Sequence, residues 1–187
     1  MREIYTTEVI TKTLSVKDMM DKYCKPEVFI EACKLCPSYG KRWSCPPDLK
    51  PTAAILDGYS TVVLSAVKVI YPDSDIARSR AMTPEQREAF REETYGVVKQ
   101  TLNDSMLAME KIIPGSMSIA AGECKRCKVC AREEGKPCRY PDLMRYSFSA
   151  LGFDITNMVK ETMNLELLWS ADSVPEYVVA AAALFIR

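Results

Sequence analysis

The sequence contains no histidine at all and only seven glycines among its 187 residues. Histidine is the side chain whose ordinary pKa lies nearest neutral pH, so its absence excludes histidine as a general acid, general base or metal ligand. The chain also lacks a G-x-x-x-x-G-K-[ST] phosphate loop, a G-x-G-x-x-G segment after a strand, and the C-x3-C-x2-C spacing of radical-SAM enzymes. These absences argue against the enzyme classes that sequence motifs mark best.

An excess of charge is missing as well, because 25 Lys and Arg balance 25 Asp and Glu. No overall field would draw the chain to nucleic acid or to an acidic membrane surface. Its longest apolar run, Tyr177–Ile186, is far shorter than the roughly 20 residues of a membrane-spanning helix. The opening residues MREIYTTEVITKTL lack the apolar core of a signal peptide. We therefore expect a cytoplasmic protein that binds neither nucleic acid nor membrane, and its oligomeric state stays open.

The composition is that of a globular protein, with 48% apolar and 27% charged residues. We predict a single metal-binding domain over residues 1–187, α+β or α/β in class, with a central sheet, flanking helices and two cysteine-rich loops at residues 24–51 and 122–141. Strands are predicted over residues 4–10, 60–71, 116–123, 165–170 and 177–186. Helices are predicted over residues 16–23, 83–113, 141–151 and 156–163.

The longest predicted helix has the clearest start signal. Thr83 caps it, Pro84 occupies the first helical position, and Gln86 completes a capping box. Pro114-Gly115 ends it. Apolar residues at helical spacing should face the core. These are Phe90, Val97, Val98, Leu102, Met106, Met109 and Ile113.

Eight cysteines are the most informative feature of the chain. Disulfides are rare in a reducing cytoplasm, and their density here falls below that of disulfide scaffolds. Metal binding or redox chemistry is the favoured interpretation.

The second cysteine group, Cys124-x2-Cys127-x2-Cys130-x7-Cys138, is the most specific motif. Its first three positions match the C-x2-C-x2-C-x3-C-P run of bacterial ferredoxins, whereas the fourth spacing does not. A [4Fe–4S] cluster is the natural occupant. Zinc is the rival, and it would need four cysteine ligands here. Buried or free thiols without metal are the third alternative.

Basic residues surround this group, including Lys125, Arg126, Lys128, Arg132, Lys136 and Arg139. They would offset the negative charge of a thiolate site, and an ordinary solvated loop explains them equally well.

The first cysteine group is Cys33-x2-Cys36-x8-Cys45, and Cys45 is followed by proline as in ferredoxins. Cys24 lies nine residues upstream, either as a further ligand or as a small buried residue. The two groups either hold separate metal centres or share ligands. Tyr39 and Trp43, between the ligands, would shield a cluster from water or simply anchor the loop.

The segments CKLCPSYGKRWSCPP and AGECKRCKVCAREEGKPCRYPDLMRYSFSALGFDI resemble the DUF2284 family of predicted metal-binding, cysteine-rich proteins. The resemblance covers most of the chain and implies metal binding without naming a reaction. In RYSFSALGFDI, Ser147 and Ser149 either line a pocket or decorate a helix, Gly152 ends that helix and Asp154 caps the next. The ligands that the resemblance implies are Cys33, Cys36, Cys45, Cys124, Cys127, Cys130 and Cys138.

Three functions remain open. The first is a protein with one or two [4Fe–4S] clusters that transfers electrons to or from a redox partner protein. The second is a structural or adaptor domain stabilised by zinc in a four-cysteine site. The third is an enzyme with two four-iron clusters, in which seven thiols leave one iron without a cysteine ligand and therefore open for chemistry.

Overall fold

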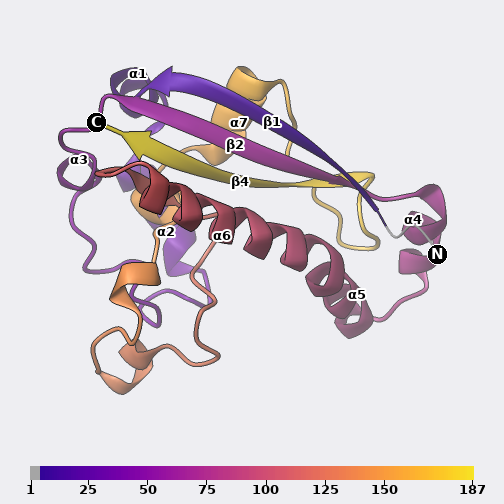
Figure 1. Cartoon of the computed structure of the whole chain (residues 1–187). Coiled ribbons are helices and arrows are strands. Elements are labelled where there is room, and N and C mark those ends of the chain that lie inside the picture. The colour runs from indigo at the N-terminus through magenta and orange to yellow at the C-terminus, as the bar shows by residue number, and fades with distance from the viewer. Residues whose placement is uncertain (1–4) are drawn as a thin grey trace.

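A four-stranded antiparallel sheet forms the centre of the computed structural model, which describes residues 5–187 (Figure 1). The spatial order is β1-β2-β4-β3, and every neighbouring pair is antiparallel. Because the sheet contains no parallel pair, the fold is α+β rather than α/β. Residue 4 of the first predicted strand lies outside the described residues. The strands are β1 (Thr6–Ser15), β2 (Thr61–Ile70), β3 (Met117–Ile119) and β4 (Tyr177–Ile186).

Seven α-helices are present among the described residues, and several begin at side-chain caps. The Ser15 hydroxyl accepts a hydrogen bond from the Asp18 amide, and Thr83 forms its capping box with Gln86. No helix of residues 5–187 has both the length and the apolar character needed to cross a membrane. The helices are α1 (Val16–Tyr23), α2 (Pro26–Lys34), α3 (Thr52–Ile55), α4 (Asp73–Arg80), α5 (Pro84–Arg91), α6 (Val97–Ile112) and α7 (Ile155–Met163).

The two central strands, β2 and β4, are buried on both faces. Leu64 and Ala183 pack with residues of α1 and α7 on one face. Val67 and Ala182 pack with Leu102 of α6 on the other, as the helices on either side of the sheet in Figure 1 indicate. Burial on both faces explains why the alanine-rich final strand is apolar at consecutive positions rather than alternating.

The long predicted helix is interrupted by a π-turn at Glu92–Gly96, between α5 and α6. Phe90 and Leu102 are buried as predicted, whereas Val97 is 52% exposed. A π-turn adds one residue to a helical turn, so the faces before and after it no longer follow one regular spacing. This extra residue explains why only some of the apolar residues predicted to face the core are buried there.

Two predicted elements are wrong. Residues 141–151 form two short 3-10 turns, Pro141–Leu143 and Ser149–Leu151, instead of one helix. Between them the Tyr146 carbonyl accepts a hydrogen bond from the Ala120 amide, so tertiary pairing replaces a helical bond. Residues 165–170 form no strand: Leu165 is buried and Leu167 packs against the core, but the segment pairs with no strand among residues 5–187 and Trp169 is 80% exposed.

Gly152 connects the start of α2 to the turn Ser149–Leu151. Its carbonyl accepts a hydrogen bond of 2.8 Å from the Lys25 amide. Its φ of 78° lies in the left-handed region, and a Cβ at this position would collide with the backbone of Pro26. Gly152 thus permits a close approach of two backbone segments. The sequence predicted that Gly152 ends the preceding helical turn, but not that it contacts Pro26. Asp154 caps α7 as predicted.

Replacing Gly152 with alanine should lower the free energy of unfolding by about 2–4 kcal/mol, because left-handed strain adds to a backbone collision. Gly58 is the matched control. It has the same φ of 78°, but its added Cβ would meet only the end of the Arg187 side chain at 3.4 Å.

Gly58→Ala should therefore cost only the left-handed strain, about 1 kcal/mol. Urea denaturation of both variants measures the difference. Equal losses in the two variants would show that the contact with Pro26 does not constrain the fold.

Candidate metal centre

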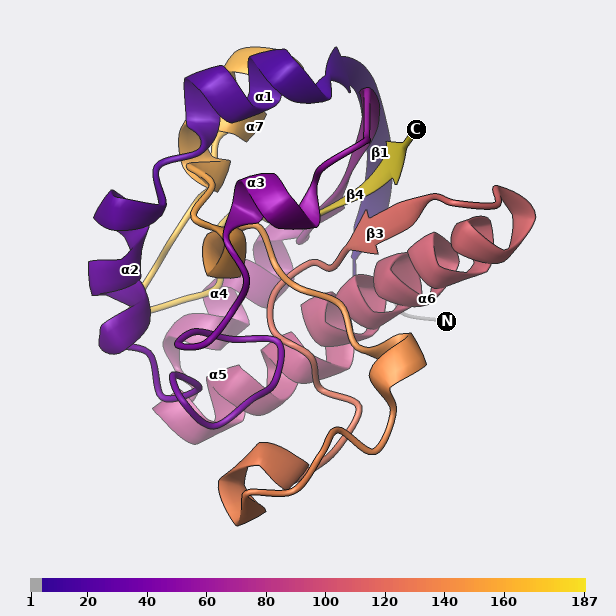
Figure 2. The same cartoon turned by 90° about the vertical axis from the view of Figure 1, so that its left-hand side faces the viewer.

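The two cysteine-rich segments lie side by side at one end of the molecule, and Figures 1 and 2 agree on this placement. They are joined by hydrogen bonds rather than by regular secondary structure. The Trp43 indole donates to the Lys136 carbonyl at 3.0 Å, and the Arg42 guanidinium donates to the Cys124 carbonyl at 3.0 Å. The two cysteine groups therefore belong to one region of the fold.

Arg132 is the main connection between these segments. Its guanidinium donates to the carbonyls of Arg42, Cys45 and Pro47 at 3.0, 2.8 and 3.1 Å. It also pairs with the Asp48 carboxylate at 2.8 Å. The Arg132 side chain is only 9% exposed. One cation from the second segment thus fixes the backbone path that carries Cys45.

The four thiols of the second cysteine group line one small cavity of about 20 Å³, together with Trp43 and Tyr140. Burial raises the pKa of the Cys124 thiol, and the neighbouring thiols of the group raise it further, while the Arg126 amide lowers it in part. The Cys124 amide in turn donates to the Ser44 hydroxyl at 3.3 Å. The structure therefore brings together all four residues that the spacing singled out.

Cations border this cavity. The Arg139 guanidinium donates to the Val129 carbonyl at 2.8 Å. Its pKa is raised first by a hydrogen bond to the Cys127 thiol, with a smaller opposing effect of desolvation. The Arg139 charge thus lies beside the second cysteine group, where it would offset the negative charge of a thiolate-bound metal.

The three thiols of the first cysteine group line a larger cavity of about 380 Å³. Cys33 lies in the last turn of α2, Cys36 is exposed in the turn that follows, and Cys45 is buried. Burial raises the pKa of the Cys33 thiol, and the nearby Cys36 thiol adds to this. Burial likewise raises the pKa of Cys45, to which Cys36 contributes. The three thiols thus line one cavity, and Cys36 lies near enough to both other thiols to raise their pKa values.

Cys24 stands apart from this trio. Its thiol contacts the Leu151 carbonyl at 3.8 Å. Burial raises its pKa, followed by Glu27, and a hydrogen bond from Thr52 opposes the shift. Cys24 and Cys33 together line a further cavity of about 650 Å³. The assignment of Cys24 as a ligand stays a prediction.

The donor chemistry fits a thiolate-bound metal in both groups. Sulfur is the soft ligand that zinc and iron–sulfur clusters prefer, and the sequence offers no histidine to replace it. Among residues 5–187, no three Cys, Asp or Glu side chains already stand in the arrangement of ligands around one ion.

Four further residues line the cavity of about 380 Å³ and were not predicted as site residues from the sequence. They are Glu88, Glu92, Tyr95 and Lys99. They recur at intervals of four, three and four residues, which is the spacing of one helical face. A polar stripe at this spacing was the available signal. Ser147 and Ser149 line the same cavity. Of the two roles predicted for these serines, lining a pocket is therefore favoured over decorating a helix.

Comparison with known proteins gives one match. The model of a family described as "Predicted metal-binding protein (DUF2284)" matches residues 16–185. No curated protein and no solved structure matches the chain.

Replacing Arg132 with glutamine should lower the free energy of unfolding by about 2–4 kcal/mol, because buried carbonyls lose a charged donor. Hydrogen exchange of the amides in residues 40–48 should accelerate in this variant. Arg80→Gln is the control, since Arg80 is exposed at the end of α4. Its effect should stay within about 0.5 kcal/mol. Unchanged exchange in Arg132→Gln would show that the loop holds its path without this cation.

Proposed function

We propose that this chain, which belongs to the DUF2284 family of predicted metal-binding proteins, carries two [4Fe–4S] centres and serves as a redox module. The observation that supports this most is the separation of seven thiols into two groups, each lining a cavity of its own. In this proposal residues 1–187 act as one metal-binding domain in the cytoplasm, with a redox protein as its partner.

Separate centres are favoured over shared ligands by the lining of the two cavities. Cys124, Cys127, Cys130 and Cys138 line one cavity, and Cys33, Cys36 and Cys45 line the other. The hydrogen bonds between the segments run through backbone carbonyls, arginines and Trp43, so they hold the groups adjacent without using the thiols as connections.

Iron–sulfur centres are favoured over zinc by the ligand spacing and by the surroundings. Three cysteines at intervals of three match the ferredoxin run, whereas zinc sites usually use two C-x2-C pairs. Cations such as Arg139 and Arg132 would offset the negative charge of a thiolate-bound cluster. When bound, such a cluster supplies one-electron transfer at a potential set by its surroundings.

An approach for the redox partner exists beside the first cysteine group. Cys36 is exposed, and its neighbour Leu35 is 87% exposed. An exposed apolar side chain next to a ligand thiol offers a partner protein a contact close to the centre, and short distances favour electron transfer. The remaining ligands of this group are less accessible, since Cys45 is buried.

Protein purified without oxygen should be brown, with acid-labile sulfide and about eight iron atoms per chain, as two four-iron clusters require. Oxygen must be excluded because freed thiols oxidise or take up other metals. Reduction with dithionite should change the visible and electron paramagnetic resonance spectra. A colourless protein that holds zinc and no iron would overturn the proposal in favour of a structural zinc domain.

Cysteine variants test whether the groups are separate. Cys36→Ala and Cys127→Ala should each leave about half of the iron, because each removes a ligand from one of two Cys-ligated clusters. Loss of all iron in either variant would instead indicate shared ligands. Cys24→Ala is the matched comparison: unchanged iron shows that the first centre has three thiol ligands, and a loss equal to that of Cys36→Ala makes Cys24 the fourth.

A further inference from the structure

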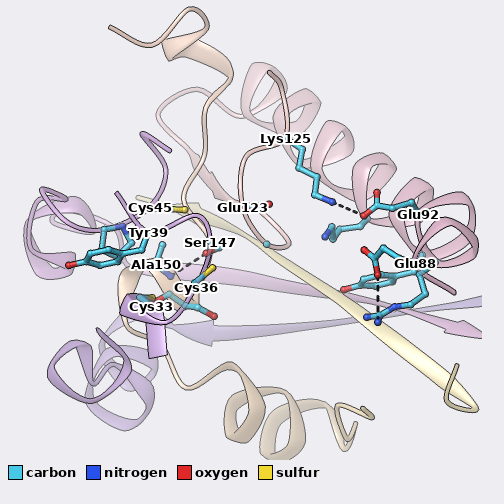
Figure 3. Close-up of a pocket in the computed structure, with 16 residues that line it drawn as sticks. Cys33, Cys36, Tyr39, Cys45, Glu88, Glu92, Glu123, Lys125, Ser147 and Ala150 are labelled. Atoms are coloured by element: carbon cyan, nitrogen blue, oxygen red, sulfur yellow. Dashed lines mark hydrogen bonds and ion pairs between the residues drawn. The ribbon is translucent and has the colours of Figure 1, made fainter. Parts of the chain in front are cut away.

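The cavity beside the first cysteine group has a second wall made of charged and aromatic side chains. Figure 3 shows the labelled thiols of Cys33, Cys36 and Cys45 across the cavity from Glu88 and Glu92. Its volume of about 380 Å³ lies within the range of small-molecule sites. A metal centre does not need this wall, which therefore calls for its own explanation.

The acidic side chains of the wall each have a cation of their own. Each carboxylate therefore has a compensating cation, so the three acidic side chains add no net charge to this wall. The pairs are Lys125 with Glu92 at 2.6 Å, Arg42 with Glu123 at 3.2 Å and Arg91 with Glu88 at 3.9 Å.

Lys99 is a fourth cation near this wall, and it lacks such a partner. Within residues 5–187 its ammonium makes no hydrogen bond or ion pair, and its nearest aromatic contact is the Tyr95 ring, 5.4 Å from Nζ to the centroid. Burial lowers the pKa of Lys99, the Lys125 charge lowers it further, and the three carboxylates offset only part of the shift. An ammonium group carries three donors, so this one is poised to bind an anion.

Glu92 and Tyr95 of this wall belong to the π-turn Glu92–Gly96, which is held by hydrogen bonds of its own. The buried Thr94 hydroxyl donates to the Phe90 carbonyl at 2.8 Å and lies 2.9 Å from the Tyr71 hydroxyl. The Tyr95 hydroxyl donates to the Val179 carbonyl of β4 at 3.2 Å, which fixes its ring at the cavity. Single π-turns inside long helices frequently mark functional sites.

We propose that this cavity binds a small organic monocarboxylate whose carboxylate pairs with the Lys99 ammonium. One unpaired cation matches one negative charge, whereas a phosphate dianion would need further unpaired cations. Tyr39, Pro46 and Ala150 line the same cavity and supply apolar surface for the rest of the ligand. The ligand would then lie against the first cysteine group. Binding of this ligand does not require a bound metal, because every contact proposed for it is to a protein side chain.

Titration calorimetry of the anaerobically purified full chain tests this with three probes: acetate, hexanoate and phenylacetate. Hexanoate and phenylacetate should bind saturably and more tightly than acetate, because they add apolar contacts. Their neutral amides, hexanamide and phenylacetamide, should bind at least about tenfold more weakly, the loss expected when a charge-assisted hydrogen bond is removed.

Lys99→Met should lose affinity for phenylacetate by at least about tenfold, and Lys99→Arg should retain most of it because the charge remains. Lys111→Met is the matched control, since Lys111 is an exposed lysine at the far end of α6. Its affinity should equal that of the unaltered protein.

Three results would overturn the proposal: no saturable binding of any probe, equal binding of acid and amide, or unchanged binding in Lys99→Met. Metal analysis of the same samples keeps the two proposals apart. A zinc-loaded protein that binds phenylacetate through Lys99 contradicts the iron–sulfur function alone. An iron-loaded protein that ignores every probe contradicts the ligand site alone.

Discussion

Backbone groups in irregular segments need hydrogen-bond partners, and this requirement determines how the two cysteine-rich segments are built. Neither segment forms enough regular structure to satisfy its own carbonyls. The Arg132 guanidinium donates hydrogen bonds to three carbonyls of the first segment, and the Arg42 guanidinium of that segment donates one to the Cys124 carbonyl of the second. The two segments therefore depend on each other for their shape. A chain in which one segment is disordered would lose the geometry of the other, whatever metal it holds.

The sheet places this region without contributing a ligand to it. Its central strands are buried on both faces, where they support α6 on one side and α1 and α7 on the other, and the Val179 carbonyl of β4 anchors the Tyr95 hydroxyl. All candidate ligands lie on loops or at the end of a short helix. This division between a rigid scaffold and functional loops is common, because loops tolerate the irregular backbone that a thiol cluster requires.

Local signals in the sequence predicted much of this arrangement. The β-branched run of β2 and the capping box at Thr83 each act over a few residues, and the structure confirms both elements. The cysteine spacing also acts locally, and the four thiols of the second group line one cavity, but their role as metal ligands stays a prediction. The errors arose where distant contacts decide. Tyr146 pairs with Ala120 instead of continuing a helix. The π-turn depends on the buried contact between Thr94 and Tyr71, which lie on different elements. The spacing of Lys99 places it on a polar helical face, but only the fold reveals that the neighbouring carboxylates are paired with other cations.

The close approach of Gly152 to Pro26 has a consequence for protein engineering. The Cys33 thiol also contacts the Ser149 carbonyl at 3.7 Å, so α2 and the turn Ser149–Leu151 are tied at two points. Cys33, Ser149 and Ala150 line both of the larger cavities and thus form a partition between them. The partition is held by the backbone hydrogen bond from Lys25 to Gly152 and by the contact of the Cys33 thiol. Other side chains of the two cavities can therefore be redesigned for ligand preference without removing either of these contacts.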